Sequence, residues 1–109
     1  MLTLKEYMDG QGRSAFKQWF DRLNAPAAVK VRTALARLEA GNTSALKSVG
    51  AGIHEVRIDF GPGYRIYLGY DGAELVILLG GSSKARQDAA IADAQGRWAD
   101  YKHRKRLGE

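Results

Sequence analysis

Five polar side chains that could do chemistry occupy alternate positions on two neighbouring segments: Glu55, Arg57 and Asp59 on the first, Arg65 and Tyr67 on the second. Side chains alternate between the two faces of a β-strand, so all five share one face if both segments are strands. Arginine can hold a phosphate through paired hydrogen bonds and stays protonated at ordinary pH. The two arginines therefore suit the stabilisation of negative charge, and the carboxylates could orient them.

The apolar positions of the same segments predict the β-hairpin that must position these residues. The alternate positions from His54 to Phe60 and from Tyr64 to Tyr70 are apolar or aromatic, which gives the hairpin a core face. Gly61-Pro62-Gly63 suits the short loop between the arms. The polar face is then either a site or a solvated surface with cross-strand ion pairs, and the residue types alone leave both interpretations open.

Two helices are predicted before the hairpin. Phe16, Trp19, Phe20 and Leu23 follow the spacing of an apolar helical stripe, and Pro26 marks the start of a second helix that ends near residue 41. Because the connection between them is so short, the two helices are expected to form an antiparallel hairpin.

The remaining segments complete an α+β fold. Residues 2–4 alternate like a short strand, 42–52 read as a loop containing Lys47, 74–79 read as a central strand, and a last helix begins near Lys84. The expected order is β-αα-βββ-α in one domain, residues 1–109. The N-terminal helical hairpin would cover the apolar face of a small, mostly antiparallel sheet and leave the opposite, arginine-bearing face open.

Composition narrows the classes of function. The chain has 109 residues and a net charge of +5, which favours polyanionic or acidic partners, and it has no cysteine and two histidines. We therefore expect no disulfide, metal site or cofactor. The N-terminus lacks the pattern of a secretory signal, and no apolar run approaches the length of a membrane span, so a cytoplasmic protein without membrane contact is expected.

The chain resembles the phage-derived addiction-module killer family within the RelE/ParE toxin superfamily. The resemblance covers nearly the whole chain and depends on the combination of Glu55-Val56-Arg57, Gly61-Pro62-Gly63-Tyr64-Arg65, Lys84 and Trp98-Ala99-Asp100-Tyr101. It implies a toxin of a type II toxin–antitoxin pair, held inactive by a cognate antitoxin, which is expected to be a small helix-turn-helix protein. Operator DNA would be bound only through that antitoxin.

The resemblance also implies the chemistry and its residues. RelE-like members cleave mRNA on the ribosome without a metal, by letting the 2′-hydroxyl attack the adjacent phosphate, and Arg57, Arg65 and Lys84 match the catalytic positions. Arginines near Lys84 would lower the pKa of its amine, so this lysine could act as a base or as a phosphate contact. Lys47, Tyr67 and Tyr101 are the expected RNA-binding residues, with Tyr67 stacking on a base.

Two alternatives share the expected fold. ParE-like members inhibit DNA gyrase and have no nuclease activity, and the lack of a clear C-terminal acid or base, with only Tyr101 and His103 nearby, keeps this function open. A degenerate toxin would act only as a partner of its antitoxin and operator.

Overall fold

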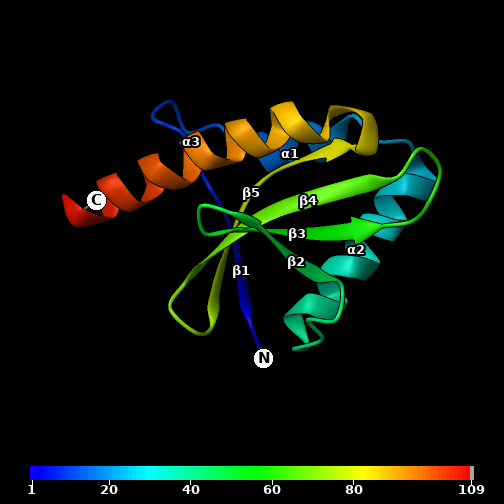
Figure 1. The fold of residues 1–109 in the computed structure, drawn as a ribbon, viewed down its shortest axis with the longest axis horizontal. Helices are drawn as coiled ribbons and strands as arrows, with labels where there is room; N and C mark the ends of the chain where they lie inside the picture. The colour runs from blue at the N-terminus through cyan, green and yellow to red at the C-terminus, as the bar shows by residue number, and fades with distance from the viewer. Residues whose placement is uncertain (109) are drawn as a thin grey trace.

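The computed structural model describes residues 1–108, in which a five-stranded sheet packs against helices (Figure 1). The elements are β1 (Thr3–Glu6), α1 (Ala15–Asp21), α2 (Ala25–Glu39), β2 (Leu46–Gly50), β3 (Ile53–Ile58), β4 (Tyr64–Asp71), β5 (Leu75–Ser83), the 3₁₀ turn η1 (Lys84–Arg86) and α3 (Gln87–Arg106). No helix among these residues is long and apolar enough to span a membrane.

The sheet confirms the α+β class with a mostly antiparallel sheet and a C-terminal helix. Its strand order is β1-β5-β4-β3-β2, and only the β1–β5 pair is parallel. The predicted hairpin is β3 and β4, joined by the Gly61-Pro62-Gly63 loop, in which both glycines have positive φ. Strand β5 is an interior strand between β1 and β4, as its continuous apolar run indicated.

One strand was not expected. Residues 46–50 form the edge strand β2 in place of the predicted loop, and they pair with β3. This strand has no apolar alternation because Lys47 and Ser48 are exposed at the sheet edge. The turn that joins it to β3 depends on positive φ values at Gly50, Ala51 and Gly52.

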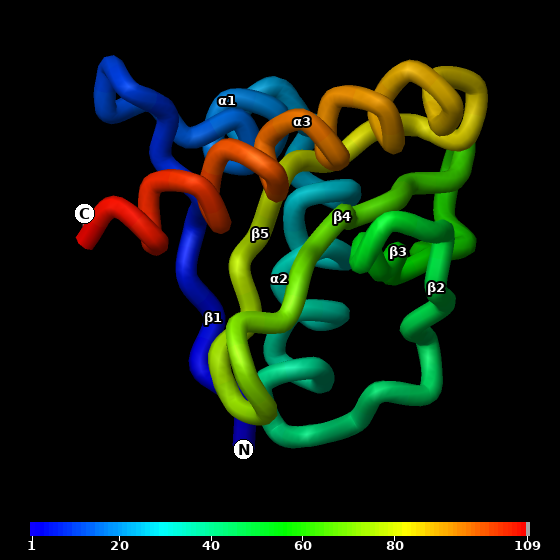
Figure 2. The backbone as a smooth tube through the Cα atoms, turned by 60° about the vertical axis from the view of Figure 1, so that its left-hand side comes forward, coloured from blue at the N-terminus to red at the C-terminus, as the bar shows by residue number. Residues whose placement is uncertain are grey.

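The expected antiparallel helical hairpin is wrong. Helix α1 packs on β5 and α2 packs on β3, so the two helices cover different parts of the sheet (Figure 2). The side chain of Trp19 fills the space over Gly81, where an added Cβ would lie 2.2 Å from the indole. The apolar stripes are therefore buried as predicted, but against strands and not against each other.

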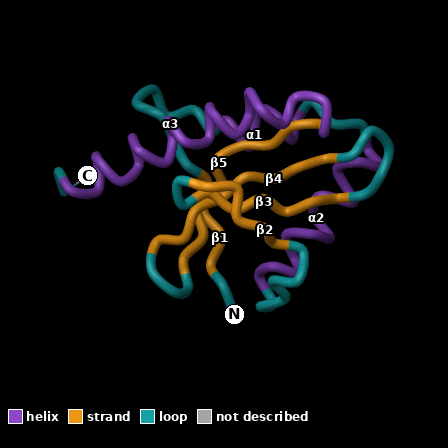
Figure 3. The backbone as a smooth tube through the Cα atoms, viewed as in Figure 1, coloured by secondary structure: helices purple, strands orange, loops and turns teal. Residues whose placement is uncertain are grey.

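The face that was expected to be open is largely covered by α3. Strands β3 to β5 run between α3 and α2 (Figure 1), and buried residues form a separate core cluster on each side of the sheet. Trp98 of α3 lies over Gly69, where an added Cβ would be 2.8 Å from the ring. The C-terminal end of α3 extends past the strands (Figure 3).

Candidate functional site

The two candidate arginines lie side by side. Arg57 on β3 and Arg65 on β4 are direct cross-strand partners, next to the hairpin loop. Residues directly opposite each other in an antiparallel pair project from the same face, so the two guanidinium groups belong to one surface. The hairpin that the sequence predicted therefore brings together Arg57 and Arg65, the first two residues of the candidate site.

The two arginines differ in exposure. The side chain of Arg57 is 42% exposed, whereas that of Arg65 is 6% exposed. Arg65 donates from Nη1 to the carbonyl oxygen of Tyr64 at 3.1 Å, and its buried Nε has no hydrogen-bond partner among the described residues. Arg57 can therefore reach a ligand more freely than Arg65 can.

Glu55 connects both arginines. Its side chain is fully buried, and its Oε1 accepts a hydrogen bond from Arg57 Nε at 2.9 Å and lies 3.7 Å from Arg65 Nε. Its Oε2 accepts a hydrogen bond from Gln87 Nε2 at 2.6 Å. A buried carboxylate is costly without such compensation, so these contacts explain how Glu55 remains inside the protein. The contact that an orienting role of Glu55 requires is thus present for Arg57.

Lys84 lies close to Arg65 because both residues contact Gly63 of the hairpin loop. Lys84 is the exposed first residue of η1, and its backbone N–H donates to the carbonyl of Gly63 at 3.0 Å. A Cβ added to Gly63 would lie 3.3 Å from Lys84 Cβ and 3.8 Å from Arg65 Nη1. Both side chains thus pack over this glycine, and the structure brings the third candidate residue to the other two.

Lys47 also belongs to this surface. It lies on β2 as the direct cross-strand partner of Glu55, and its side chain is exposed. The group therefore holds four cations, Arg57, Arg65, Lys84 and Lys47, around the single buried carboxylate of Glu55. Such an excess of positive charge at an exposed edge attracts anions.

Tyr67 does not contribute a surface for stacking. Its ring is completely buried beneath α3, and its hydroxyl is 3.0 Å from Ser82 Oγ. Burial, with a further effect of the nearby Glu55 charge, raises the pKa of Tyr67 above its ordinary value. The prediction that Tyr67 stacks on a base is therefore wrong, because a polar position on an alternating strand was covered by a helix.

Tyr101 lies far from the arginines. Its hydroxyl donates to Asp71 Oδ2 at 2.6 Å, and its ring stacks on Trp98 with a centroid distance of 5.4 Å. Asp71 is six residues beyond Arg65 on β4, a separation of roughly 20 Å along a strand. Burial and the bond to Asp71 raise the pKa of Tyr101 to about 12. Tyr101 therefore lies apart from Arg57 and Arg65, and its expected part in RNA binding stays a prediction.

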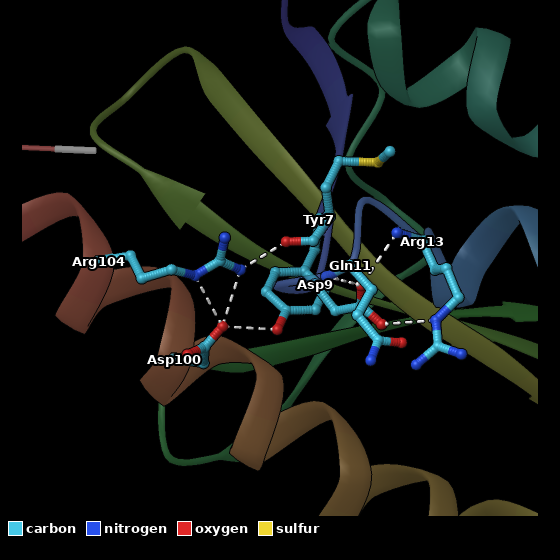
Figure 4. A network of polar contacts seen from close by, with 7 residues as sticks. Tyr7, Asp9, Gln11, Arg13, Asp100 and Arg104 are labelled. Carbon is cyan, nitrogen blue, oxygen red and sulfur yellow. Dashed lines mark hydrogen bonds and ion pairs between the residues drawn. The ribbon is translucent and has the colours of Figure 1, made fainter.

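A second polar network fixes α3 at its other end (Figure 4). Tyr7, just after β1, donates from its hydroxyl to Asp100 Oδ2 at 2.6 Å, and Arg104 donates from Nε to the same oxygen at 2.9 Å. The hydrogen bond from Tyr7 has the largest effect on the pKa of Asp100, and with the bond from Arg104 it holds this pKa below its usual range. In the loop between β1 and α1, Asp9 accepts hydrogen bonds from Arg13. The network anchors the helix and lies apart from the cationic group.

A cleft of about 720 Å³ lies between α1, the end of β5 and the first half of α3. Its lining includes Arg22, Arg86 and Arg97, together with Ser82, which is the cross-strand partner of Arg65. Arg57 and Lys84 do not line it. The candidate site is thus an exposed cationic edge and not the floor of a deep pocket. Within residues 1–108, no group of three or more acidic, histidine or cysteine residues is arranged to hold a metal ion.

Comparison with known proteins places the chain in a family. No known family model matches it. A protein of Haemophilus influenzae (strain ATCC 51907 / DSM 11121 / KW20 / Rd) is 44% identical over 81 residues, which make up 73% of this chain and 82% of that protein. The chain belongs to the same family as this protein. That relative is described as an uncharacterized protein, so its description carries no activity to transfer.

Proposed function

We propose that the chain is the toxin of a type II toxin–antitoxin system of the RelE/ParE kind, and that it cleaves mRNA on the ribosome. The observation that supports this most is the convergence of residues that are distant in sequence. Arg57 and Arg65 pair directly across β3 and β4, and Lys84 packs over Gly63 beside Arg65. These are the three positions that the sequence resemblance marks as catalytic.

The geometry suggests how the cations would share the work. Arg57 Nε is bound to Glu55, while its terminal nitrogens make no hydrogen bond to the described residues and are available to a phosphate. Lys84 is exposed on the other side of Arg65. A scissile phosphate between Arg57 and Lys84 would have its developing negative charge stabilised as the 2′-hydroxyl attacks. Arg65, being buried, would add positive potential from behind.

One of the two proton transfers is assigned to Lys84 in this proposal. Tyr67 is buried, Tyr101 is bound to Asp71, and His54 lies on the opposite face of β3 against Tyr70. Lys84 and Lys47 are thus the exposed amines of this surface, and Lys84, which packs beside Arg65, would give a proton to the leaving 5′-oxygen while the proton of the attacking 2′-hydroxyl passes to water. The antitoxin would silence the protein in the cytoplasm by covering this edge.

A second candidate function has an observation of its own. No tyrosine or histidine with an exposed side chain lies beside Arg57 and Arg65 among the described residues, and this favours a binding protein that inhibits its target without chemistry, as ParE-like toxins do with DNA gyrase. Such a protein would need the same exposed cations for docking but no acid or base.

Induced expression in a bacterial host separates the two candidates. Incorporation of labelled methionine and labelled thymidine would be followed in parallel after induction of the wild type, Arg57→Ala and the control Arg32→Ala. Arg32 is exposed on α2, on the other side of the sheet. An mRNA-cleaving toxin stops methionine incorporation first, and Arg57→Ala relieves the arrest. An early loss of thymidine incorporation would favour gyrase inhibition, and no growth effect would contradict both.

A further inference from the structure

We infer that Gln87 is a positioning residue of the cationic site, which holds Glu55 and thereby fixes the relation between Arg57 and Lys84. The inference rests on the proposed function, since it concerns how the same site is held in place. Gln87 is the first residue of α3, and nothing in the alternation of the strands or in the apolar spacing of the helix singles it out.

The first step concerns the needs of a buried carboxylate. An ionised carboxylate only accepts hydrogen bonds, and when it is buried both of its oxygens need donors. In Glu55, Oε1 is served by Arg57 from β3, and Oε2 is served by Gln87 at 2.6 Å. Among residues 1–108, no other side chain donates to Oε2. Because Gln87 provides the hydrogen bond to Oε2, Oε1 is turned toward the arginines.

The second step concerns what this bond joins. Glu55 and Gln87 are 32 residues apart, and their bond ties the start of α3 to β3. Lys84 lies three residues before Gln87 and is itself bound through its backbone N–H to Gly63. The segment from Lys84 to Gln87 is thus attached to the hairpin at both ends. Loss of the Gln87 bond would free one end and loosen Lys84 relative to Arg57.

The third step explains why an amide suits this position. The charged groups that face Glu55 are Arg57 and Arg65 from the hairpin and Lys47 from β2, while Asp88, which follows Gln87 on α3, is exposed. A cation in place of Gln87 would compete with Arg57 for the carboxylate. A glutamate would bring two negative charges together. The amide donates a hydrogen bond without changing the charge, so the positive potential of the surface is kept.

The test compares Gln87→Leu and Gln87→Glu with the control Gln95→Leu, which makes the same chemical change at an exposed position of α3. Binding of a labelled 2′-O-methyl RNA, which lacks the attacking hydroxyl, is measured from pH 5 to pH 8. The Nε–H signal of Arg57 is followed by NMR in the same samples, and circular dichroism checks folding.

Gln87→Leu is expected to bind about tenfold more weakly than the wild type, and Gln95→Leu is expected to bind like it. Gln87→Glu should bind within about twofold of the wild type at pH 5, where two close carboxyl groups share a proton and one can donate to the other, and lose about tenfold by pH 8. Its Arg57 Nε–H signal should move over the same range, while that of the wild type stays in place.

Folded Gln87 variants that bind RNA like the wild type, with an Arg57 signal unmoved across the pH range, would overturn the inference. If the wild type itself fails to bind the RNA, RNA binding by the free protein is ruled out, and the Arg57 signal still decides whether Gln87 positions the arginine. If Gln87→Leu does not fold, the pH response of Gln87→Glu gives the answer, because it is measured within one folded protein.

Discussion

Arg57 and Arg65 face each other across β3 and β4, yet the side chain of Arg57 is 42% exposed and that of Arg65 is 6% exposed. Like charges directly opposite each other in a sheet destabilise it. Here the buried carboxylate of Glu55 lies within 2.9 Å of one Nε and 3.7 Å of the other. The pair is therefore held together by a shared counter-ion, and its two members differ in how much of their side chains is exposed.

This difference predicts unequal effects on stability. Arg57→Ala leaves Oε1 of the buried Glu55 without its hydrogen-bond donor, although water can enter the space of the partly exposed side chain, and should lower the free energy of unfolding by about 1 to 2 kcal/mol. Arg65→Ala removes a buried partner of Glu55 and the bond to Tyr64, and should cost about 2 to 3 kcal/mol. Urea unfolding of both variants measures the difference. Equal losses would show that the buried position of Arg65 carries no energetic weight.

Lys84→Ala should change RNA binding but not the stability of the fold. The side chain is exposed, and its backbone bond to Gly63 survives the substitution, so the free energy of unfolding should stay within about 0.5 kcal/mol of the wild type. If Lys84 contacts a phosphate, the slope of log affinity for RNA against log salt should fall by about 1. Lys5→Ala, an exposed change on β1, serves as the control. An unchanged slope for Lys84→Ala would remove this lysine from the RNA-binding surface.

Two glycines should respond in opposite directions to alanine. At Gly81 an added Cβ would lie 2.2 Å from the ring of Trp19, so Gly81→Ala should destabilise the protein by about 3 kcal/mol or more. Gly96 lies within α3 with no atom within 4 Å of the added Cβ, and Gly96→Ala should stabilise by about 0.5 to 1 kcal/mol. Thermal unfolding tests both changes. A neutral Gly81→Ala would contradict the packing of α1 on β5.

The bond between Tyr101 and Asp71 predicts a loss of stability in alkali. The folded-state pKa of Tyr101 is raised from 10.0 to about 12, so its contribution is fully present below about pH 10 and is lost as the pH rises toward 12. Tyr101→Phe should remove this part of the pH dependence. Unfolding at a series of pH values, with ultraviolet titration of the tyrosines, measures it. Titration of Tyr101 near pH 10 would contradict the bonded geometry.

The sequence was most informative where alternation and turn chemistry act locally. The period of two from His54 to Tyr70 predicted both arms of the hairpin and the shared face of Arg57 and Arg65, and the Gly61-Pro62-Gly63 loop predicted where they turn. The apolar run after Glu74 predicted β5 as an interior strand. These features depend on residues close together in the chain, so one sequence is enough to find them.

The errors concern what packs against what. A helical stripe shows that Trp19 is buried but not that its partner is Gly81, so α1 and α2 were wrongly paired with each other. Strand alternation marked Glu55 and Tyr67 as polar positions, but it carried no information that α3 covers them. Gln87 was missed for the same reason, because its importance comes from a contact 32 residues away.

The most direct test of the account is to map the 5′ ends of transcripts by primer extension after induction of the wild type and of folded Arg57→Ala. The account predicts new cleavage sites within translated regions shortly after induction of the wild type, and their strong reduction in Arg57→Ala. Growth arrest by the wild type without new transcript ends, or identical cleavage by both proteins, would contradict it.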